Sequence, residues 1–206
     1  MTNFKRLIYL YSCFLSVALL ISCQGYERDK GNWSYFYSSY THDKIMFPLN
    51  VDNNTFVVIK EDNYAKDKDK VFYKESLIKY ANPKTFKVID DTYSCDDKYV
   101  FFQYGIISGA DPKSFVRLEF PFSKDKNDVY NGSIPMRAKK GSLFNIIENE
   151  AGIITSGIDE MFIEKYPNYS NLDTIKCSII FYTPFSKTIV GNQKYYGIQK
   201  VQDWPK

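Results

Sequence analysis

The stretch Ala81-Asn82-Pro83-Lys84-Thr85-Phe86 recurs 29 residues later as Ala110-Asp111-Pro112-Lys113-Ser114-Phe115. The same shift relates two further sets of residues: Val71-Phe72 to Val100-Phe101 and Val129-Tyr130, and Asp67 to Asp96 and Asp125. Self-similarity at a fixed period is the sequence signature of a repeat protein. The sequence therefore predicts a chain built from consecutive copies of one supersecondary unit.

Degenerate copies flank these two clear ones. Thr55-Phe56-Val57-Val58-Ile59 matches Thr85-Phe86-Lys87-Val88-Ile89 at a shift of 30, and Phe144 is a further copy of the phenylalanine without a proline before it. Asp43-Lys44-Ile45-Met46-Phe47 resembles a degenerate first copy of Asp69-Lys70-Val71-Phe72-Tyr73. We therefore expect the repeats to cover residues 41–145.

Each unit alternates between turn-forming and strand-forming segments. The charged run Lys66–Lys70 cannot bury a face and predicts a solvated turn, whereas Val71-Phe72-Tyr73 has the residue types of a strand. Asn82-Pro83 favours a second turn, because proline presets φ and the asparagine side chain can accept a hydrogen bond from a backbone N–H of the following residues. In Phe115–Phe120 apolar and charged residues alternate, which predicts a half-buried strand with Val116, Leu118 and Phe120 inside.

These segments together predict two short strands and two turns in each unit. The predicted fold class is therefore mainly all-β: an antiparallel β-meander or hairpin repeat of about 29 residues, with one short helix near the C-terminal part. The high content of Tyr and Phe, 18 and 16 residues, agrees with strands. We expect most of these rings to fill the core and only some to be exposed.

The repeat resembles the DKNYY family of repeat lipoproteins, which is found widely in Bacteroidota and relatives. The residues that carry the resemblance are Asp69-Lys70-Val71-Phe72-Tyr73, Asp97-Lys98-Tyr99-Val100-Phe101-Phe102, Ala110-Asp111-Pro112-Lys113-Ser114-Phe115 and Asp125-Lys126-Asn127. The resemblance covers residues 41–145 and carries no catalytic residue over to this chain.

The amino terminus has the pattern of a targeting segment. Lys5 and Arg6 precede an uncharged apolar stretch of residues 7–22, which is short for a membrane span. The stretch ends in Leu20-Ile21-Ser22-Cys23, which resembles a bacterial lipobox. We therefore predict a cleaved signal peptide of residues 1–22 and acylation of Cys23, for example with palmitate; a plain secretory signal or an uncleaved anchor are the alternatives.

The lipobox also predicts where the protein resides. Two or three acyl chains hold a protein stably in a bilayer, whereas one chain does so only marginally. Gln24 follows the cysteine, where an aspartate would suggest retention at the inner membrane. We therefore expect a cell-envelope protein, lipid-anchored at the outer membrane. Its periplasmic or surface orientation stays open.

Charge and cysteine content narrow the possible partners. Cleavage removes Lys5 and Arg6, which leaves 25 basic against 24 acidic residues and a mature charge of +1. Nucleic-acid binding calls for a clustered basic face, so we expect no nucleic-acid partner.

Once Cys13 is cleaved off and Cys23 is acylated, Cys95 and Cys177 are the cysteines that remain. An exported compartment permits a disulfide between them, and two reduced thiols are the alternative.

Motifs for catalysis or metal binding are missing from the sequence. His42 is the one histidine and lies in a polar stretch, where a solvated side chain is expected. Asp67 and Asp69 have a spacing that calcium sites also use, but the interposed lysine and the lack of a terminal bidentate Glu favour a solvated turn. We therefore predict no metal, no cofactor and no enzymatic activity.

The segments outside the repeats are predicted to belong to the same domain. Residues 23–40 are expected to form a lipid-anchored tether and a first strand, and residues 146–206 a β-rich C-terminal part. In that part Asp159–Tyr166 predicts the one short helix, and Gly191-Asn192 predicts the turn of a closing hairpin.

Three functions remain compatible with the sequence. The first is a non-enzymatic envelope lipoprotein whose β-repeat surface binds an envelope protein or acts as a scaffold. The alternative is a glycan-binding accessory lipoprotein, which would need exposed aromatic side chains along a groove. The third, a hydrolase, would need two acidic side chains that converge in a deep pocket.

Overall fold

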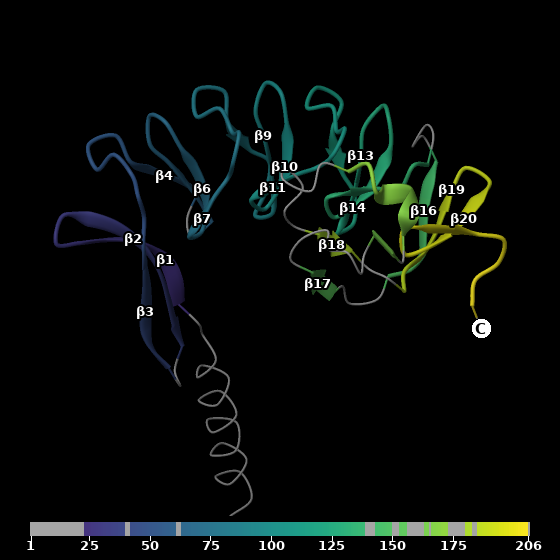
Figure 1. Cartoon of the computed structure of the whole chain (residues 1–206), viewed down its shortest axis with the longest axis horizontal. Coiled ribbons are helices and arrows are strands. Elements are labelled where there is room, and N and C mark those ends of the chain that lie inside the picture. The colour runs from purple at the N-terminus through teal and green to yellow at the C-terminus, as the bar shows by residue number, and fades with distance from the viewer. Residues whose placement is uncertain are drawn as a thin grey trace, which may run out of the picture.

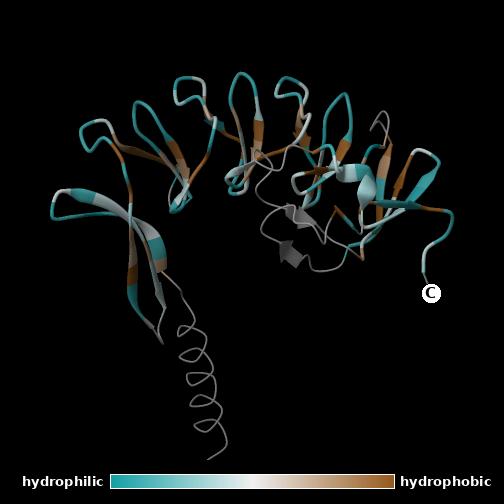
Figure 2. Cartoon of the chain, in the orientation of Figure 1, coloured by the Kyte–Doolittle hydropathy of each residue, from teal (hydrophilic) through white to brown (hydrophobic). Residues whose placement is uncertain are grey.

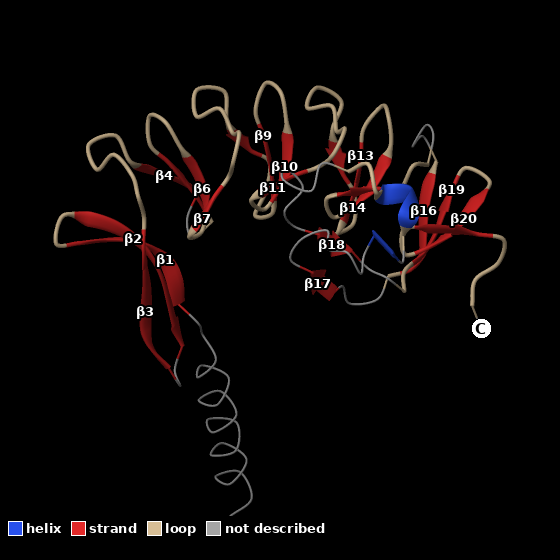
Figure 3. Cartoon of the chain, in the orientation of Figure 1, coloured by secondary structure: helices blue, strands red, loops and turns tan. Residues whose placement is uncertain are grey.

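The computed structural model describes residues 23–39, 42–60, 63–138, 143–149, 153–155, 163–164, 166–172, 180–182 and 185–205. Apart from two short helical stretches, its regular elements are antiparallel strands (Figure 3). The all-β fold class and the antiparallel repeat are therefore confirmed. The predicted signal peptide, residues 1–22, lies outside the described residues.

Three four-stranded antiparallel sheets follow one another along the chain (Figure 1). Unit 1 consists of β4 (Val57–Lys60), β5 (Tyr64–Lys66), β6 (Val71–Tyr73) and β7 (Ser76–Leu77). Unit 2 consists of β8 (Lys87–Val88), β9 (Tyr93–Cys95), β10 (Val100–Phe102) and β11 (Gly105–Ile106). Unit 3 consists of β12 (Val116–Arg117), β13 (Phe122–Lys124), β14 (Val129–Asn131) and β15 (Ile134–Pro135). The period of 29 residues is thus confirmed, and each unit has four strands rather than the predicted two.

The predicted strand Phe115–Phe120 is much shorter in the structure. Only Val116 and Arg117 pair with β13, and both are exposed. Phe115 packs into the core, whereas Phe120 is 48% exposed, because the chain turns back at Leu118, whose N–H donates to the carbonyl of Phe122. The prediction that Val116 and Phe120 lie inside was wrong, since this edge strand ends before the alternation can continue.

A fourth unit is interrupted by a long insertion. β16 (Phe144–Glu148) pairs with β19 (Lys187–Val190), and β20 (Gln193–Tyr196) and β21 (Gln199–Val201) complete the sheet in the order β16-β19-β20-β21. One backbone hydrogen bond identifies it as a repeat unit, since it recurs in all four: Lys74 to Asn63, Gln103 to Thr92, Gly132 to Pro121 and Gly197 to Ser186. Unit 4 therefore has the strand order of units 1 to 3, with residues 149–186 inserted after its first strand.

The insertion carries a two-stranded sheet and a 3-10 helix. β17 (Ile153–Thr155) pairs with β18 (Ile180–Tyr182), and η2 spans Pro167–Tyr169. Most of the predicted helix Asp159–Tyr166 lies outside the described residues, although Ile163 and Glu164 are helical. The predicted hairpin around Gly191-Asn192 is confirmed as β19–β20, but β21 follows it, so it does not close the domain.

The amino-terminal sheet differs from the four units. It contains β1 (Cys23–Asp29), β2 (Asn32–Ser39) and β3 (His42–Pro48), which are longer than the strands of the repeats. β1 begins at Cys23 itself, which pairs with Ser38, so the residues after Cys23 form a strand rather than a tether. Asp43–Phe47, which the sequence suggested as a degenerate first repeat, lies in β3 of this sheet and outside the four-stranded units.

The core lies at the junctions between neighbouring units. Figure 2 shows apolar residues concentrated in the strands and polar residues at the hairpin tips. One aromatic contact repeats at each junction, where a ring of β5, β9 or β13 meets the phenylalanine of the next unit: Tyr64 and Phe86, Tyr93 and Phe115, Phe122 and Phe144. Repeat proteins gain stability from such nearest-neighbour contacts, so the units support one another along the row.

Candidate binding surfaces

The recurring aspartates of the charged segments hold the turns together. These clamp aspartates are Asp67, Asp96 and Asp125, and they are 4–6% exposed. In unit 2, Oδ1 of Asp96 accepts from the backbone N–H groups of Lys98 and Tyr99 at 2.7 and 2.6 Å, and Oδ2 accepts from Asn82 N–H at 2.9 Å. Each clamp aspartate therefore ties its own hairpin to the preceding Asx turn.

The prediction that the charged segments are solvated was wrong for these aspartates. Asp67 and Asp125 make the same three bonds, with Oδ2 accepting from Asp52 N–H at 2.8 Å and from Asp111 N–H at 2.5 Å. A buried carboxylate is tolerated only where donors satisfy it, and three backbone amides do so here. Within the described part of the chain, no group of three or more His, Cys, Asp or Glu residues could hold a metal ion.

The hydroxyl and Asx residues of the motif complete the clamp. Ser114 Oγ accepts from Lys126 N–H at 3.2 Å and donates to Asp111 at 2.6 Å. In unit 2 the equivalent Thr85 accepts from Asp97 N–H at 3.3 Å but donates to the carboxylate of Asp97. The Ser114 and Lys126 side chains lower the pKa of Asp111, and the Thr85 and Asn82 side chains lower that of Asp97. The repeated sequence motif is thus explained by turn geometry rather than by binding chemistry.

A row of aliphatic side chains runs along the first strands of the units. This aliphatic row contains one equivalent residue from each unit: Ile59, Ile89, Leu118 and Ile147. The three isoleucines are 39%, 41% and 53% exposed, and Leu118 is half-buried. Val57 and Val116 are both 51% exposed nearby in the same first strands, each at the edge of its sheet. Exposed apolar groups that recur at one position of a repeat make a continuous surface.

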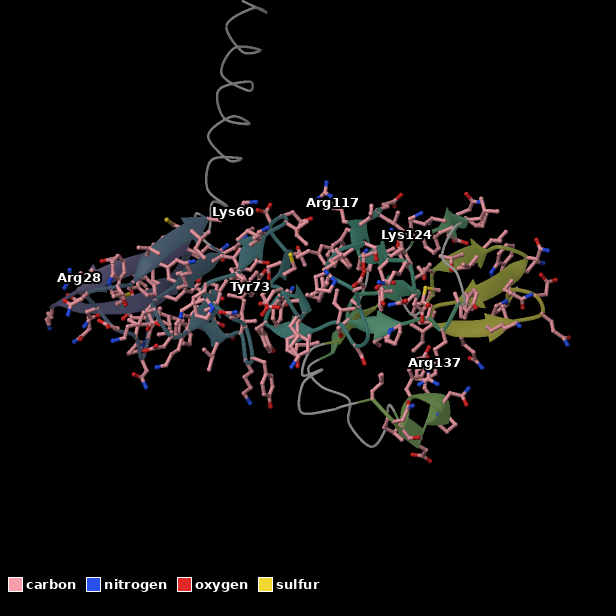
Figure 4. The ribbon with its side chains drawn as sticks, turned by 90° about the horizontal axis from the view of Figure 1, so that it is seen from above. Arg28, Lys60, Tyr73, Arg117, Lys124 and Arg137 are labelled. Carbon is pink, nitrogen blue, oxygen red and sulfur yellow. The ribbon has the colours of Figure 1, made fainter. Side chains whose placement is uncertain are left out.

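Charged residues beside the aliphatic row form ion pairs. Lys60 pairs with Asp91 at 2.7 Å, Arg117 with Asp90 at 2.7 Å, and Lys187 with Glu148 at 2.6 Å. Figure 4 shows Lys60 and Arg117 on one long side of the row of units, and Arg137 on the other. These three pairs carry no net charge, so apolar contact rather than the charge of these residues would select what binds there.

A cavity of about 410 Å³ lies between the insertion and the last two units. Its lining comes from Met136 and Arg137 after unit 3, from Tyr195 and Ile198–Lys200 in unit 4, and from Tyr166 to Tyr169 in the insertion. A smaller cavity of about 290 Å³ lies next to the Asp90–Arg117 ion pair, with Tyr93 and Phe120 in its wall. Sequence reasoning missed both cavities, because their walls come from separate segments.

The described part of the structure places two of the predicted site residues. Cys23 is exposed at the start of β1, and Cys95 is half-buried in β9, where burial raises the pKa of its thiol. Cys177 lies outside the described residues, so the Cys95–Cys177 disulfide stays a prediction. His42 begins β3, and its side chain also lies outside the described part. Across the described ranges, no helix is both long and apolar enough to cross a membrane.

The comparison with family models identifies the repeat. The model of the DKNYY family matches residues 6–105, which include the amino-terminal sheet, unit 1 and unit 2. This part of the chain belongs to the DKNYY family. Searches of the curated proteins and of the solved structures returned no match. The family match starts before the repeats predicted from the sequence, which began at residue 41, and units 3 and 4 extend the same architecture beyond it.

Proposed function

We propose that this DKNYY-family chain is a non-enzymatic cell-envelope lipoprotein, anchored at the outer membrane through Cys23, whose repeat surface binds another envelope protein. The observation that carries this proposal is the aliphatic row. An aliphatic residue stands at one position of all four units, and three of the four are well exposed. Folding alone would favour polar residues at such positions, so a partner that covers the row gives these side chains a role.

The surroundings of the row favour a protein as the partner. Protein interfaces have an apolar centre and a polar rim, and here three ion pairs within the chain lie beside the row. A partner segment that lies across several units would meet the same side chains at regular intervals. Such a segment would gain affinity from each unit, and loss of one contact would weaken binding only in part.

Site-specific photocrosslinking in the native bacterium tests this proposal. A photoreactive residue at Ile89 and another at Ile147 should each trap the same partner, whereas one at Lys113, which is exposed in the turn before β12, should trap none. With the probe at Ile147, Ile89→Ser should reduce the yield of that adduct several-fold. Different adducts at the two positions, the same adduct at Lys113, or no effect of Ile89→Ser would refute the aliphatic row as the binding surface.

The anchor needs a separate experiment. Cys23→Ser removes the thiol that would be acylated, so the protein should carry no acyl chains and keep the mass of the unprocessed chain. Ser38→Ala, at the residue paired with Cys23, serves as the control for disturbance of β1. Membrane attachment and mass that are unchanged in Cys23→Ser would contradict the lipid anchor without affecting the crosslinking result.

A further inference from the structure

We propose that the cavity between the insertion and units 3 and 4 binds a small anionic sugar. This site lies on the side of the row of units opposite to Lys60 and Arg117, so it is separate from the aliphatic row (Figure 4). The inference does not depend on the protein-binding function. It rests on the charge of the rim, the fixed position of one arginine and the nature of the walls.

The rim of the cavity is positively charged. Arg137 and Lys200 are exposed and contribute to its lining, and none of the described lining residues is acidic. The guanidinium of Arg137 donates to the side-chain oxygen of Asn171 at 2.6 Å, and this partner is neutral. Arg117, in contrast, pairs with the carboxylate of Asp90. The charge of Arg137 is therefore left available for an anion, and guanidinium binds carboxylate and phosphate well.

The backbone around Arg137 holds this cation in place. Arg137 has a left-handed backbone conformation with φ of 55°, which is unfavourable for a residue with a Cβ. The carboxylate of Asp128 fixes this turn by accepting from the N–H groups of Arg137 at 3.0 Å and Ala138 at 2.8 Å. The guanidinium then lies 4.9 Å from the centre of the Tyr169 ring. Strained backbone that positions a functional group is a common feature of binding sites.

Asp128, the acidic residue that bonds the backbone N–H of Arg137, is turned toward the backbone. Besides Arg137 and Ala138, its Oδ1 accepts from Val129 N–H at 2.8 Å. Burial raises the pKa of Asp128, although the three backbone donors lower it in part. Its charge is therefore engaged by amides and leaves the cavity rim net positive.

The walls suit a ring that carries hydroxyl groups. Tyr166 and Tyr169 lie at 85° to each other with centroids 6.4 Å apart, so they form a corner, and the buried Tyr195 also contributes to the wall. Asn168 and Gln199 add exposed amides, which can both donate to and accept from hydroxyl groups. The volume of about 410 Å³ lies within the range typical of small-molecule sites. Together these groups match a sugar that bears a carboxylate or a phosphate.

Calorimetric titration of the full lipoprotein in detergent tests the proposal with three matched probes. Glucuronate and glucose 6-phosphate should bind at least about tenfold more tightly than glucose, since each adds a charge-assisted hydrogen bond to the guanidinium. The stronger of the two anionic probes distinguishes a carboxylate from a phosphate ligand. Added NaCl should weaken the binding. Failure of both anionic probes to bind at millimolar concentration, or equal binding of glucose, would overturn the proposal.

Two variants separate the site from the fold. Arg137→Gly removes the guanidinium and fits the left-handed backbone, and Lys200→Ala removes the second cation from an exposed strand position. Each should lower the affinity for the anionic probe at least about fivefold, whereas Lys113→Ala, outside the cavity, should not change it. If inorganic phosphate bound as tightly as glucose 6-phosphate, or if neither variant affected binding, the site would not be one for an anionic sugar.

Discussion

Units 1 to 3 and unit 4 have the same strand order, but they fix their central hairpin by different means. In units 1 to 3 a clamp aspartate accepts from two backbone amides of the hairpin and from one amide of the preceding turn. In unit 4 the equivalent residue is Val190, which is 5% exposed and packs in one cluster with Phe122 and Tyr195. The four-stranded meander can therefore be held either by a polar clamp or by apolar packing. The polar clamp occurs where no insertion interrupts the unit.

The largest effect is expected from breaking a clamp. Asp67→Ala would leave three amide N–H groups without their acceptor, and we expect a loss of about 3 kcal/mol or more in the free energy of unfolding. Val190→Ala, at the equivalent position of unit 4, should cost about 1–2 kcal/mol, because only two methyl groups are lost. Urea unfolding measures the loss of stability in both variants. Asp69→Ala, two residues away and exposed, is the control, and a cost equal to that of Asp67→Ala would refute the clamp.

A smaller effect is expected at the turn that follows the third strand of each unit. The residue there has a positive φ in all four units: Lys74 at 54°, Gln103 at 54°, Gly132 at 62° and Gly197 at 61°. Gly197→Ala should destabilise the protein by about 1–2 kcal/mol, since a Cβ is unfavourable in this conformation. Gln103→Gly should stabilise it by about 0.5 kcal/mol, because relief of that strain outweighs the entropy lost by glycine. Thermal unfolding should show shifts of opposite sign, and shifts of the same sign would contradict this.

The sequence predicts the repeat well because the clamp and the junction contacts need the same residue types in each copy. Asp67, Asp96 and Asp125, and the phenylalanines that begin the units, recur for that reason. The number of strands could not be predicted, since strands such as Ser76–Leu77 and Lys87–Val88 have two residues, too few for a periodic pattern. The exposure of side chains on the edge strands was also predicted wrongly, because each edge strand stops pairing with its neighbour after a few residues.

Of unit 4, only the start of the first strand was predicted, through Phe144, because the insertion separates that strand from the other three. Its clamp position is also occupied by Val190, so the most conspicuous residue of the pattern is lost. One weak signal was available: Tyr130 and Gly132 recur with the same spacing as Tyr195 and Gly197. The cavity could not be predicted at all, because its lining residues come from three separate segments without a shared motif.

The ion pair between units 2 and 3 predicts a pH-dependent contribution that unit 4 lacks. Burial raises the pKa of Asp90, but Arg117 and the N–H groups of Thr92 and Tyr93 lower it more, so the net shift is downward. Unit 4 has Ile146 at the position of Arg117. A carboxyl whose pKa is lower in the folded state stabilises the fold above its unfolded pKa of about 4. This contribution is lost as the pH falls through the folded pKa.

Arg117→Ala tests this contribution. The pair is partly exposed, so we expect a small loss in the free energy of unfolding at pH 6, and a smaller one at pH 2.5, where a larger fraction of Asp90 is protonated. Urea unfolding at the two pH values gives the difference. Ile146→Ala, which removes no charge, is the control and should lower the free energy of unfolding by the same amount at both pH values. A cost of Arg117→Ala that does not change with pH would mean that the ion pair does not stabilise the junction.

The smallest effect is expected at a buried position where the units use different side chains. Ala65, Ser94, Ser123 and Thr188 are equivalent and fully buried, and Oγ1 of Thr188 has no hydrogen-bond partner within the described residues. Ala65 indicates that the fold needs no polar group here. Thr188→Val keeps the shape and removes a buried hydroxyl, so it should stabilise the protein by about 0.5 kcal/mol in urea unfolding. Ala65→Ser, which adds a buried hydroxyl, should destabilise the protein. If Thr188→Val destabilised the protein instead, its hydroxyl would be satisfied by a buried water, and unit 4 would then contain a polar anchor of its own.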